Sequence, residues 1–331
     1  MDNESKIKQI VEYIKRVPTG DNMQHWVFSI DGHKVYLQHE DEFADHILNQ
    51  SRISSYIALG FLLGYVDAAQ KAFNVLIDVE RNDLNLTLII KSLERFQQCD
   101  KTDPYLVRYT DRRLFDSQIT PEELKKVQKQ FPTIKTLDME TAPSDSKKLI
   151  FANEKRTYTS VSFFVDFLKW VRFSQKDYEK RKDGMTTEQL SLGAIDVITL
   201  FIFKHFPVVI PLILKTPLFV FLELTLKKFY KNSHLIVFEC EDYRNDESLI
   251  EASREVIKLW AELSRQGIST QPMNVTFLPL IEIFRNGDSS EDDVKRYANL
   301  ANLFESDQKP FWVFRVGKVH KPLKIQPTLR R

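Results

Sequence analysis

Residues 53–73 read ISSYIALGFLLGYVDAAQKAF, and this stretch organises the prediction for the rest of the chain. Small or apolar side chains occupy most positions between Ile57 and Ala68, so the stretch has little polar face. A segment of this length that is apolar nearly all round is typical of a helix buried on most of its sides. We therefore expect one long buried helix over these residues.

One β-hairpin is predicted before this helix in the sequence and a second one after it. Their strands and turns are residues 26–30 and 34–38 around Asp31-Gly32, and residues 75–79 and 85–89 around Asn82-Asp83. Apolar residues alternate along these runs, and the turns contain residues that favour tight reversals. An amphipathic helix at residues 6–16 is expected to precede the first hairpin.

A similar order of elements follows a polar stretch at residues 97–103, which we interpret as a linker. A helix is expected to begin at Thr120-Pro121, because proline is favoured at the first helical position. Further expected elements are helices at 163–172 and 248–265 and buried strands at 235–238 and 311–316. The sequence therefore predicts an α+β chain with an N-terminal half at residues 1–100 and a C-terminal half at residues 101–331.

Composition excludes several classes of protein. The 47 Lys and Arg residues nearly balance the 46 Asp and Glu residues, so no affinity for nucleic acid is expected. Cys99 and Cys240 form no disulfide or zinc pattern, which favours a reducing compartment. Residues 1–5 are polar and unlike a signal peptide, so we expect a cytoplasmic protein. No phosphate-loop, hydrolase or metalloprotease motif occurs, and neither a catalytic side chain nor a metal site is predicted.

The most apolar part of the chain runs from Val197 to Leu226. Lys204, His205 and Lys215 interrupt it, whereas a spanning helix needs about 20 mostly apolar residues. We interpret it as part of an apolar, lid-like insertion around residues 183–226, and we expect no membrane partner. A scaffold whose apolar segment faces a membrane is the less favoured alternative.

Arg108, Thr110 and Arg112 alternate along the chain. On an extended segment their side chains would share one side, which would place two guanidinium groups beside a hydroxyl. Such a group can bind phosphate oxygens, since arginine donates in a planar fork. A solvated basic turn paired to Asp111 and Asp116 is the alternative for this segment.

Residues 18–26 read PTGDNMQHW and follow the first helix. Asn22 and Gln24 would offer amide donors and acceptors, and Trp26 closes the turn before a strand. These groups suit the edge of a planar heterocycle. A helix-ending turn that packs on a core tryptophan is the simpler interpretation of the same residues.

Both segments resemble motifs of the nitroreductase superfamily. Residues 18–26 are similar to the motif P-S-x-x-N-x-Q-P-W, and residues 108–115 to the R-x-S/T-x-R/K stretch that holds the phosphate of FMN. Residues 267–273 resemble the helix-end segment that faces the flavin ring, and residues 327–331 the C-terminal basic segment. The order of the first two motifs resembles the branch of single-chain, internally duplicated members, which imitate the homodimer within one polypeptide.

The resemblance implies a nitroreductase-like fold in which two related helix-and-antiparallel-sheet halves pack as a pseudo-dimer around one FMN site. It assigns three groups of cofactor-binding residues: the phosphate to Arg108, Thr110, Arg112 and Arg330, the ring edge and ribityl chain to Pro18, Thr19, Gly20, Asn22 and Gln24, and the approach to the ring from the second half to Pro272, Met273 and Asn274. The sequence departs from the motif at His25, which replaces a proline and could contact substrate, although a packed or solvent-facing histidine is the favoured interpretation.

The implied function is NAD(P)H-dependent reduction of an electron-poor small molecule, with the flavin carrying the redox chemistry. The main alternative is an FMN-binding or storage protein whose lid covers the flavin and prevents turnover with nicotinamide. The chain would be a monomeric pseudo-dimer or a homodimer.

Overall fold

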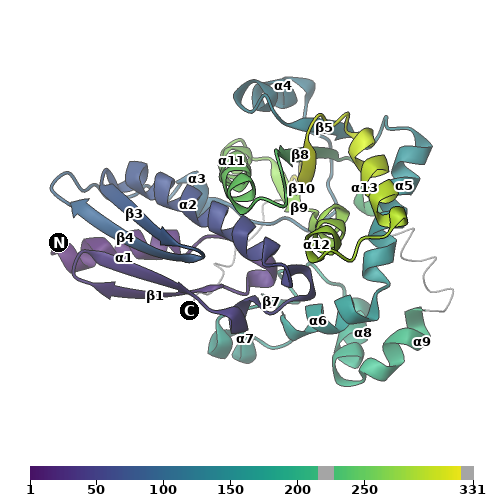
Figure 1. The fold of residues 1–331 in the computed structure, drawn as a ribbon, viewed down its shortest axis with the longest axis horizontal. Helices are drawn as coiled ribbons and strands as arrows, with labels where there is room; N and C mark the ends of the chain where they lie inside the picture. Colours follow the sequence, from purple (N-terminus) through teal and green to yellow (C-terminus); the bar gives the residue numbers. More distant parts are fainter. Residues whose placement is uncertain (215–226, 322–331) are drawn as a thin grey trace.

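The computed structural model describes residues 1–214 and 227–321, and it shows an α+β chain with two antiparallel four-stranded sheets (Figure 1). The first sheet has the strand order β1-β2-β4-β3 and the second β5-β8-β10-β9. All strands of the first sheet precede residue 93, and all strands of the second follow residue 134. In the sequence, the polar stretch at residues 97–103 that we interpreted as a linker therefore lies between the strands of the first sheet and those of the second.

The N-terminal elements match the predicted helices and hairpins, with ends that differ by a few residues. In chain order they are α1 (Asn3–Ile14), η1 (Gly20–Asn22), β1 (Trp26–Asp31), β2 (Lys34–His39), η2 (Asp41–Ala44), η3 (Ile47–Asn49), α2 (Ile53–Phe73), β3 (Leu76–Asn82) and β4 (Asn85–Ser92). Alternate residues of β4 are buried, and they belong to the same apolar core as α1 and α2. The period-2 pattern of the sequence thus places one face of this sheet against the helices.

The C-terminal elements include the helices and strands that the sequence predicted and several that it did not. They are α3 (Pro104–Val107), α4 (Pro121–Gln130), β5 (Lys135–Asp138), α5 (Ser144–Tyr158), α6 (Val161–Lys169), β6 (Val171–Arg172), α7 (Gln175–Arg181), β7 (Met185–Thr186), α8 (Ala194–His205), η4 (Pro207–Val209), α9 (Ile210–Leu214), β8 (His234–Cys240), α11 (Asp246–Arg265), β9 (Ser269–Pro272), η5 (Asn274–Thr276), α12 (Leu278–Asn286), α13 (Glu291–Leu303) and β10 (Lys309–Gly317).

Two local features explain where the predicted elements begin and end. Thr120 caps α4 by accepting the backbone N–H of Glu123, and the carboxylate of Glu123 accepts the backbone N–H of Thr120 in the same capping box. The helix expected at residues 163–172 ends at Lys169, because the following residues pair with β7 as the short strand β6. After α11, Gly267 adopts a φ of 69°, which lets the chain reverse into strand β9.

Helices α2 and α11 pack against each other at the centre of the molecule (Figure 1). A Cβ atom at Gly60 would lie well under 3.0 Å from the backbone oxygen of Ile250, and one at Gly64 equally close to the side chain of Ile257. The two glycines therefore allow a backbone-to-backbone approach that other residues would prevent. Both helices contribute to one apolar core that continues through the N-terminal and C-terminal halves.

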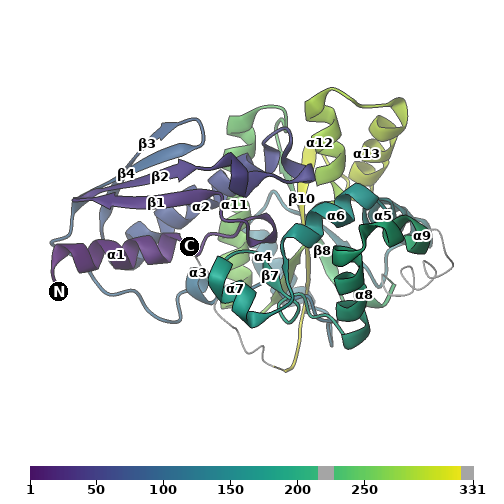
Figure 2. The same cartoon turned by 90° about the horizontal axis from the view of Figure 1, so that it is seen from below.

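A second, smaller apolar cluster lies apart from this core. Its buried members are Leu168, Val171, Phe203 and Ile210, which come from α6, β6, α8 and α9. These elements lie together on the face that is turned toward the viewer in Figure 2. They include the described part of the insertion expected around residues 183–226, of which residues 215–226 lie outside the described residues. Within the described ranges, no helix combines the length and the apolar character that crossing a membrane requires.

We expect Gly60→Ala to lower the free energy of unfolding by about 1–3 kcal/mol, because the added methyl group must push α2 and α11 apart. Denaturant unfolding followed by circular dichroism measures the change. Gly193→Ala is the matched control, since the nearest atom to its new Cβ is an oxygen of the exposed Asp196 carboxylate. Equal stability of the two variants would contradict the close packing of the helices.

Candidate functional site

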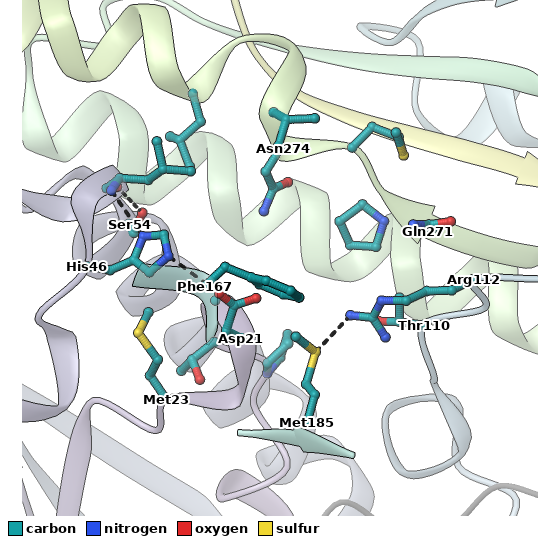
Figure 3. A pocket seen from close by; sticks show the side chains of 18 of the residues that line it. Asp21, Met23, His46, Ser54, Thr110, Arg112, Phe167, Met185, Gln271 and Asn274 are labelled. Atoms are coloured by element: carbon teal, nitrogen blue, oxygen red, sulfur yellow. Dashed lines mark hydrogen bonds and ion pairs between the residues drawn. The ribbon is translucent and has the colours of Figure 1, made fainter. Parts of the chain in front are cut away.

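A cavity of about 420 Å³ lies between the N-terminal and C-terminal halves (Figure 3). This volume falls within the range of about 300–1,000 Å³ that is usual for small-molecule sites. The segments that line it are the turn at residues 18–23, residues 46–61 around the start of α2, residues 110–112, α5 and α6, residues 185–200, residues 271–278, Trp260 of α11 and Trp312 of β10. The site is therefore assembled from stretches that are far apart in the sequence.

Most of the cofactor residues implied by the resemblance meet at this cavity. Those that line it are Pro18, Thr19, Gly20, Thr110, Arg112, Pro272, Met273 and Asn274. Asn22, Gln24 and Arg108 do not line it, and Arg330 lies outside the described residues. The structure thus brings together residues from three of the four motif-like segments.

Asn22 and Gln24 hold the turn against the C-terminal half. The Nδ2 of Asn22 donates to the carbonyl oxygen of Gly184 at 2.9 Å, and the N–H of Gly184 donates to the carbonyl oxygen of Asn22 at 3.1 Å. The side-chain amide of Gln24 donates to the carbonyl oxygen of Lys182. Asp21, Asn22 and Gln24 have φ angles of 45°, 57° and 59°, in the left-handed region that non-glycine residues rarely adopt. These bonds stabilise a strained backbone beside the cavity.

Arg108 lies behind one wall of the cavity. Its guanidinium carbon is 4.1 Å from the centroid of the Trp260 ring, which itself lines the cavity. It donates to the hydroxyl of Tyr65 at 3.2 Å and to the carbonyl oxygen of Arg16 at 3.4 Å. In this structure Arg108 therefore supports the wall through Trp260 rather than reaching into the cavity.

Arg112 reaches into the cavity, whereas its neighbour Arg113 is paired to Asp111 at 2.8 Å. Arg112 donates to the carbonyl oxygen of Gln189 at 3.1 Å and lies 3.1 Å from the sulfur of Met185. In the described part of the chain, no carboxylate oxygen lies within the 4.0 Å of an ion pair with it. Burial lowers the pKa of Arg112, and the charge of Asp21 only partly opposes this.

Arg112 is half-buried, and a guanidinium that loses part of its hydration is favoured by a neighbouring anion. Thr110 adds a hydroxyl on the same side of the cavity (Figure 3). This part of the cavity is therefore suited to a phosphate or another small anion.

Two amide oxygens of residues that line the cavity have no hydrogen-bond partner among residues 1–214 and 227–321. They are Oε1 of Gln271 and Oδ1 of Asn274, and both atoms are buried. A buried acceptor left unpaired costs about 1–3 kcal/mol, so each favours a bound molecule that presents an N–H or O–H group. The motif resemblance identified Asn274 and missed Gln271, although Gln271 is the one polar side chain next to Pro272 in the same segment.

The remaining walls are mainly apolar, with aromatic, sulfur-containing and aliphatic side chains. The aromatic side chains are Phe61, Tyr158, Phe163, Phe164, Phe167, Trp260 and Trp312, and the thioethers are those of Met23, Met185 and Met273. Flat rings and flexible thioethers pack well against a planar ligand. The cavity therefore combines an anion-binding side with walls for a planar heterocycle.

His46 and Asp21 form a polar pair on the side of the cavity opposite Arg112 (Figure 3), and the sequence did not predict them. Nδ1 of His46 accepts the N–H of Leu48 at 3.0 Å. Its Nε2 lies 3.4 Å from Oδ2 of Asp21 and 3.5 Å from Oδ2 of Asp166. Burial acts to lower the pKa of His46, but Asp21 and Asp166 outweigh it and the pKa is raised. No spacing in the sequence identifies this pair, because its members meet only in the fold.

His25 is packed inside and does not line the cavity. Both of its ring nitrogens are buried and have no hydrogen-bond partner in the part of the chain that the structure describes, and burial lowers its pKa to about 3. It therefore stays neutral and packs against Trp26 and His39, at centroid distances of 5.6 Å and 5.7 Å. Of the two interpretations of His25, the structure supports the packed one.

Ser55, His39 and Asp41 have the spacing of a hydrolase triad, with Ser55 Oγ 3.1 Å from His39 Nε2 and Asp41 Oδ1 3.3 Å from His39 Nδ1. Ser55 is fully buried and also accepts a bond from Asn49 at 2.9 Å. A substrate cannot reach this hydroxyl, so the cluster is a capping network at the start of α2.

No protein-family model matches this chain, and no curated protein is significantly similar to it. The function is therefore argued from the geometry of the cavity and from the motifs that resemble the nitroreductases.

Glu154 of α5 is fully buried behind the cavity, one helical turn before Tyr158. The hydroxyl of Tyr230 donates to its Oε1, and Thr276 lies at 3.4 Å from the same atom. Burial raises its pKa from 4.5 to about 7, although the bonds from Tyr230 and Thr276 oppose this. The folded state therefore holds a proton that the unfolded state releases at lower pH.

This shift predicts that Glu154 reduces stability as the pH rises from 4.5 to about 7. The loss should be about 3 kcal/mol, since one pKa unit corresponds to about 1.4 kcal/mol. Glu154→Gln keeps an acceptor for Tyr230 and removes the titration. Denaturant unfolding should show this variant to be more stable than the wild type at pH 8, with the difference shrinking toward pH 4.5. A difference that does not depend on pH would contradict the assignment.

Proposed function

We propose that this chain is a cytoplasmic FMN-binding protein of the nitroreductase type, with one flavin site between two halves that form a pseudo-dimer. The observation that carries the proposal is Arg112, a half-buried cation with no carboxylate of the described residues in ion-pair contact, at the side of a mainly apolar cavity. FMN matches this cavity in kind, because it joins a planar heterocycle to a phosphate.

The arrangement of the halves supports the pseudo-dimer. Each half contains a long helix with an antiparallel four-stranded sheet, α2 with the first sheet and α11 with the second. The two helices pack together at the centre, and the cavity lies beside the start of α2. This is the arrangement expected if the chain imitates a homodimer whose ligand site lies between subunits.

The lining residues can be assigned to parts of the cofactor by their chemistry. Arg112 and Thr110 would hold the phosphate, since they supply a positive charge and a hydroxyl donor. Gln271 and Asn274 would accept hydrogen bonds from the N–H and O–H groups of the ring edge and the ribityl chain. When bound, the flavin would accept a hydride from NAD(P)H and pass it to an electron-poor substrate.

A flavin store without turnover is the second candidate, and one observation favours it. Phe163, Phe164 and Phe167 of α6 line the cavity, and so does Leu200 of α8. If a flavin occupied the cavity, these side chains would leave little room for a nicotinamide beside it. Which of the two functions applies therefore depends on whether α6 and α8 can move.

We expect the protein purified without added flavin to show the absorption bands of oxidised flavin. We expect the Arg112→Gln variant to retain at least tenfold less flavin than the wild type. A hydrogen bond from a charged group is worth about 1.5–3 kcal/mol, and this sets the expected loss. Arg156→Gln is the matched control, because Arg156 is exposed on α5 and pairs with Asp292 at the surface. A colourless wild type that also fails to take up added FMN would contradict the proposal.

We also expect the flavin-loaded protein to oxidise NAD(P)H when a quinone or a nitroaromatic acceptor is present. The consumption of NAD(P)H at its absorption maximum measures this activity, with the Arg112→Gln variant as the flavin-poor control. A protein that holds flavin stoichiometrically and oxidises neither NADH nor NADPH would instead support the storage function.

A further inference from the structure

Helices α6 and α8 are held together by their own apolar contacts. Phe164 of α6 meets Phe203 of α8 at a centroid distance of 5.9 Å, and both belong to the small cluster around Leu168 and Ile210. This cluster is separate from the core that joins α2 and α11. A movement of the two helices as one body would therefore leave the buried core around α2 and α11 intact.

The inner sides of both helices face the cavity. The aromatic side chains of α6 lie over it, with Phe167 at its centre in Figure 3, and Leu200 of α8 lines it as well. The opposite side of α8 is exposed, with Ile195 and Ile198 at 79% and 61% exposure. The pair of helices therefore packs against the rest of the chain through the side that faces the cavity.

Asp166 connects α6 to the N-terminal half. Its Oδ2 accepts the backbone N–H of Ile47 at 2.6 Å and lies 3.5 Å from Nε2 of His46. Its Oδ1 pairs with Lys169 at 2.6 Å, and Lys169 reaches Asp45 at 3.5 Å. Short bonds to an ionised carboxylate are among the stronger hydrogen bonds in proteins.

The position of Asp166 makes it the main polar connection at this boundary. In residues 1–214 and 227–321, each hydrogen bond or ion pair from α6 or α8 to the N-terminal half involves Asp166 or Lys169. Asp166 is only 8% exposed, so water does not readily compete for its bonds. The same carboxylate meets His46, which in turn contacts Asp21 at the cavity.

We propose that α6 and α8 form a lid that must lift for a ligand to enter or leave the cavity, and that Asp166 is the latch residue that holds this lid closed. The identity of the ligand as FMN rests on the proposed function, whereas the lid and its latch do not. With the latch closed the chain keeps its ligand as a store would, and with the latch open the covered face becomes accessible to a second molecule.

Hydrogen exchange of the flavin-free chain tests the latch without any cofactor. In Asp166→Ala we expect the amides of residues 161–169 and of Ile47 to exchange roughly tenfold faster or more, because the variant loses a charged acceptor. The amides of α2 and α11 should exchange as in the wild type, which also shows that the variant is folded. Val165→Ala is the matched control, since Val165 lies on the same helix and its side chain is exposed.

Lys169→Met provides a second variant that keeps the bond from Ile47 to Asp166 and removes only the lysine arm, so its α6 exchange should rise by a smaller factor. Unchanged exchange of α6 in Asp166→Ala would overturn the latch. So would an equal rise in Val165→Ala, because the effect would then be a general loosening of the helix.

The rate of FMN release separates the two proposals. We expect FMN fluorescence to appear at least tenfold faster on dilution of loaded Asp166→Ala than of loaded wild type. A wild type that binds FMN while α6 exchange and FMN release are both unchanged in the variant would refute the latch and leave the cofactor proposal standing. Faster α6 exchange in a chain that never binds FMN would refute the cofactor and leave the latch.

Discussion

The contact between α2 and α11 at Gly60 and Gly64 fixes the relation between the two halves. Because no side chain separates the helices there, the backbone of α2 touches the backbone of α11 near Ile250. A single apolar core then runs through both halves, so they cannot shift independently. The turn at residues 18–23 and the strand β9 are attached to opposite halves, and this packing sets the distance between them.

The cavity occupies the space between the turn at residues 18–23 and strand β9, which the packing of α2 against α11 sets. Its polar groups come from segments that no local interaction would bring together: Asp21 and His46 from the N-terminal half, and Arg112, Gln271 and Asn274 from the C-terminal half. Each of the last three is left with unmet charge or hydrogen-bonding capacity, and the strained backbone at Asp21 lines the same cavity. Unmet polar groups and backbone strain that gather at one cavity are typical of a ligand site.

The sequence predicted the elements whose pattern is strong and local. The helix at residues 53–73 and both N-terminal hairpins are confirmed, because apolar periodicity and turn residues specify them without help from distant parts. The strands β5 and β9 were not predicted. Each has four residues, and only pairing with β8 or β10 makes it a strand.

The candidate site was predictable in part. Motif resemblance selected the segments around Thr19, Arg112 and Asn274 that meet at the cavity, but it could not give the direction of every side chain. Arg108 stacks on Trp260, and Asn22 bonds to Gly184, because partners from the other half were available to them. His46 was missed since its carboxylate neighbours come from η1 and α6, far from it in the sequence.

The central claim is that Arg112 makes this cavity a site for the phosphate of FMN. The most direct measurement is a fluorescence titration of the flavin-free protein with FMN and with riboflavin, for the wild type and for Arg112→Gln. The account predicts that the wild type binds FMN at least tenfold more tightly than riboflavin and that this preference disappears in the variant. Equal affinities for FMN and riboflavin in the wild type, or a preference that survives the loss of Arg112, would contradict it.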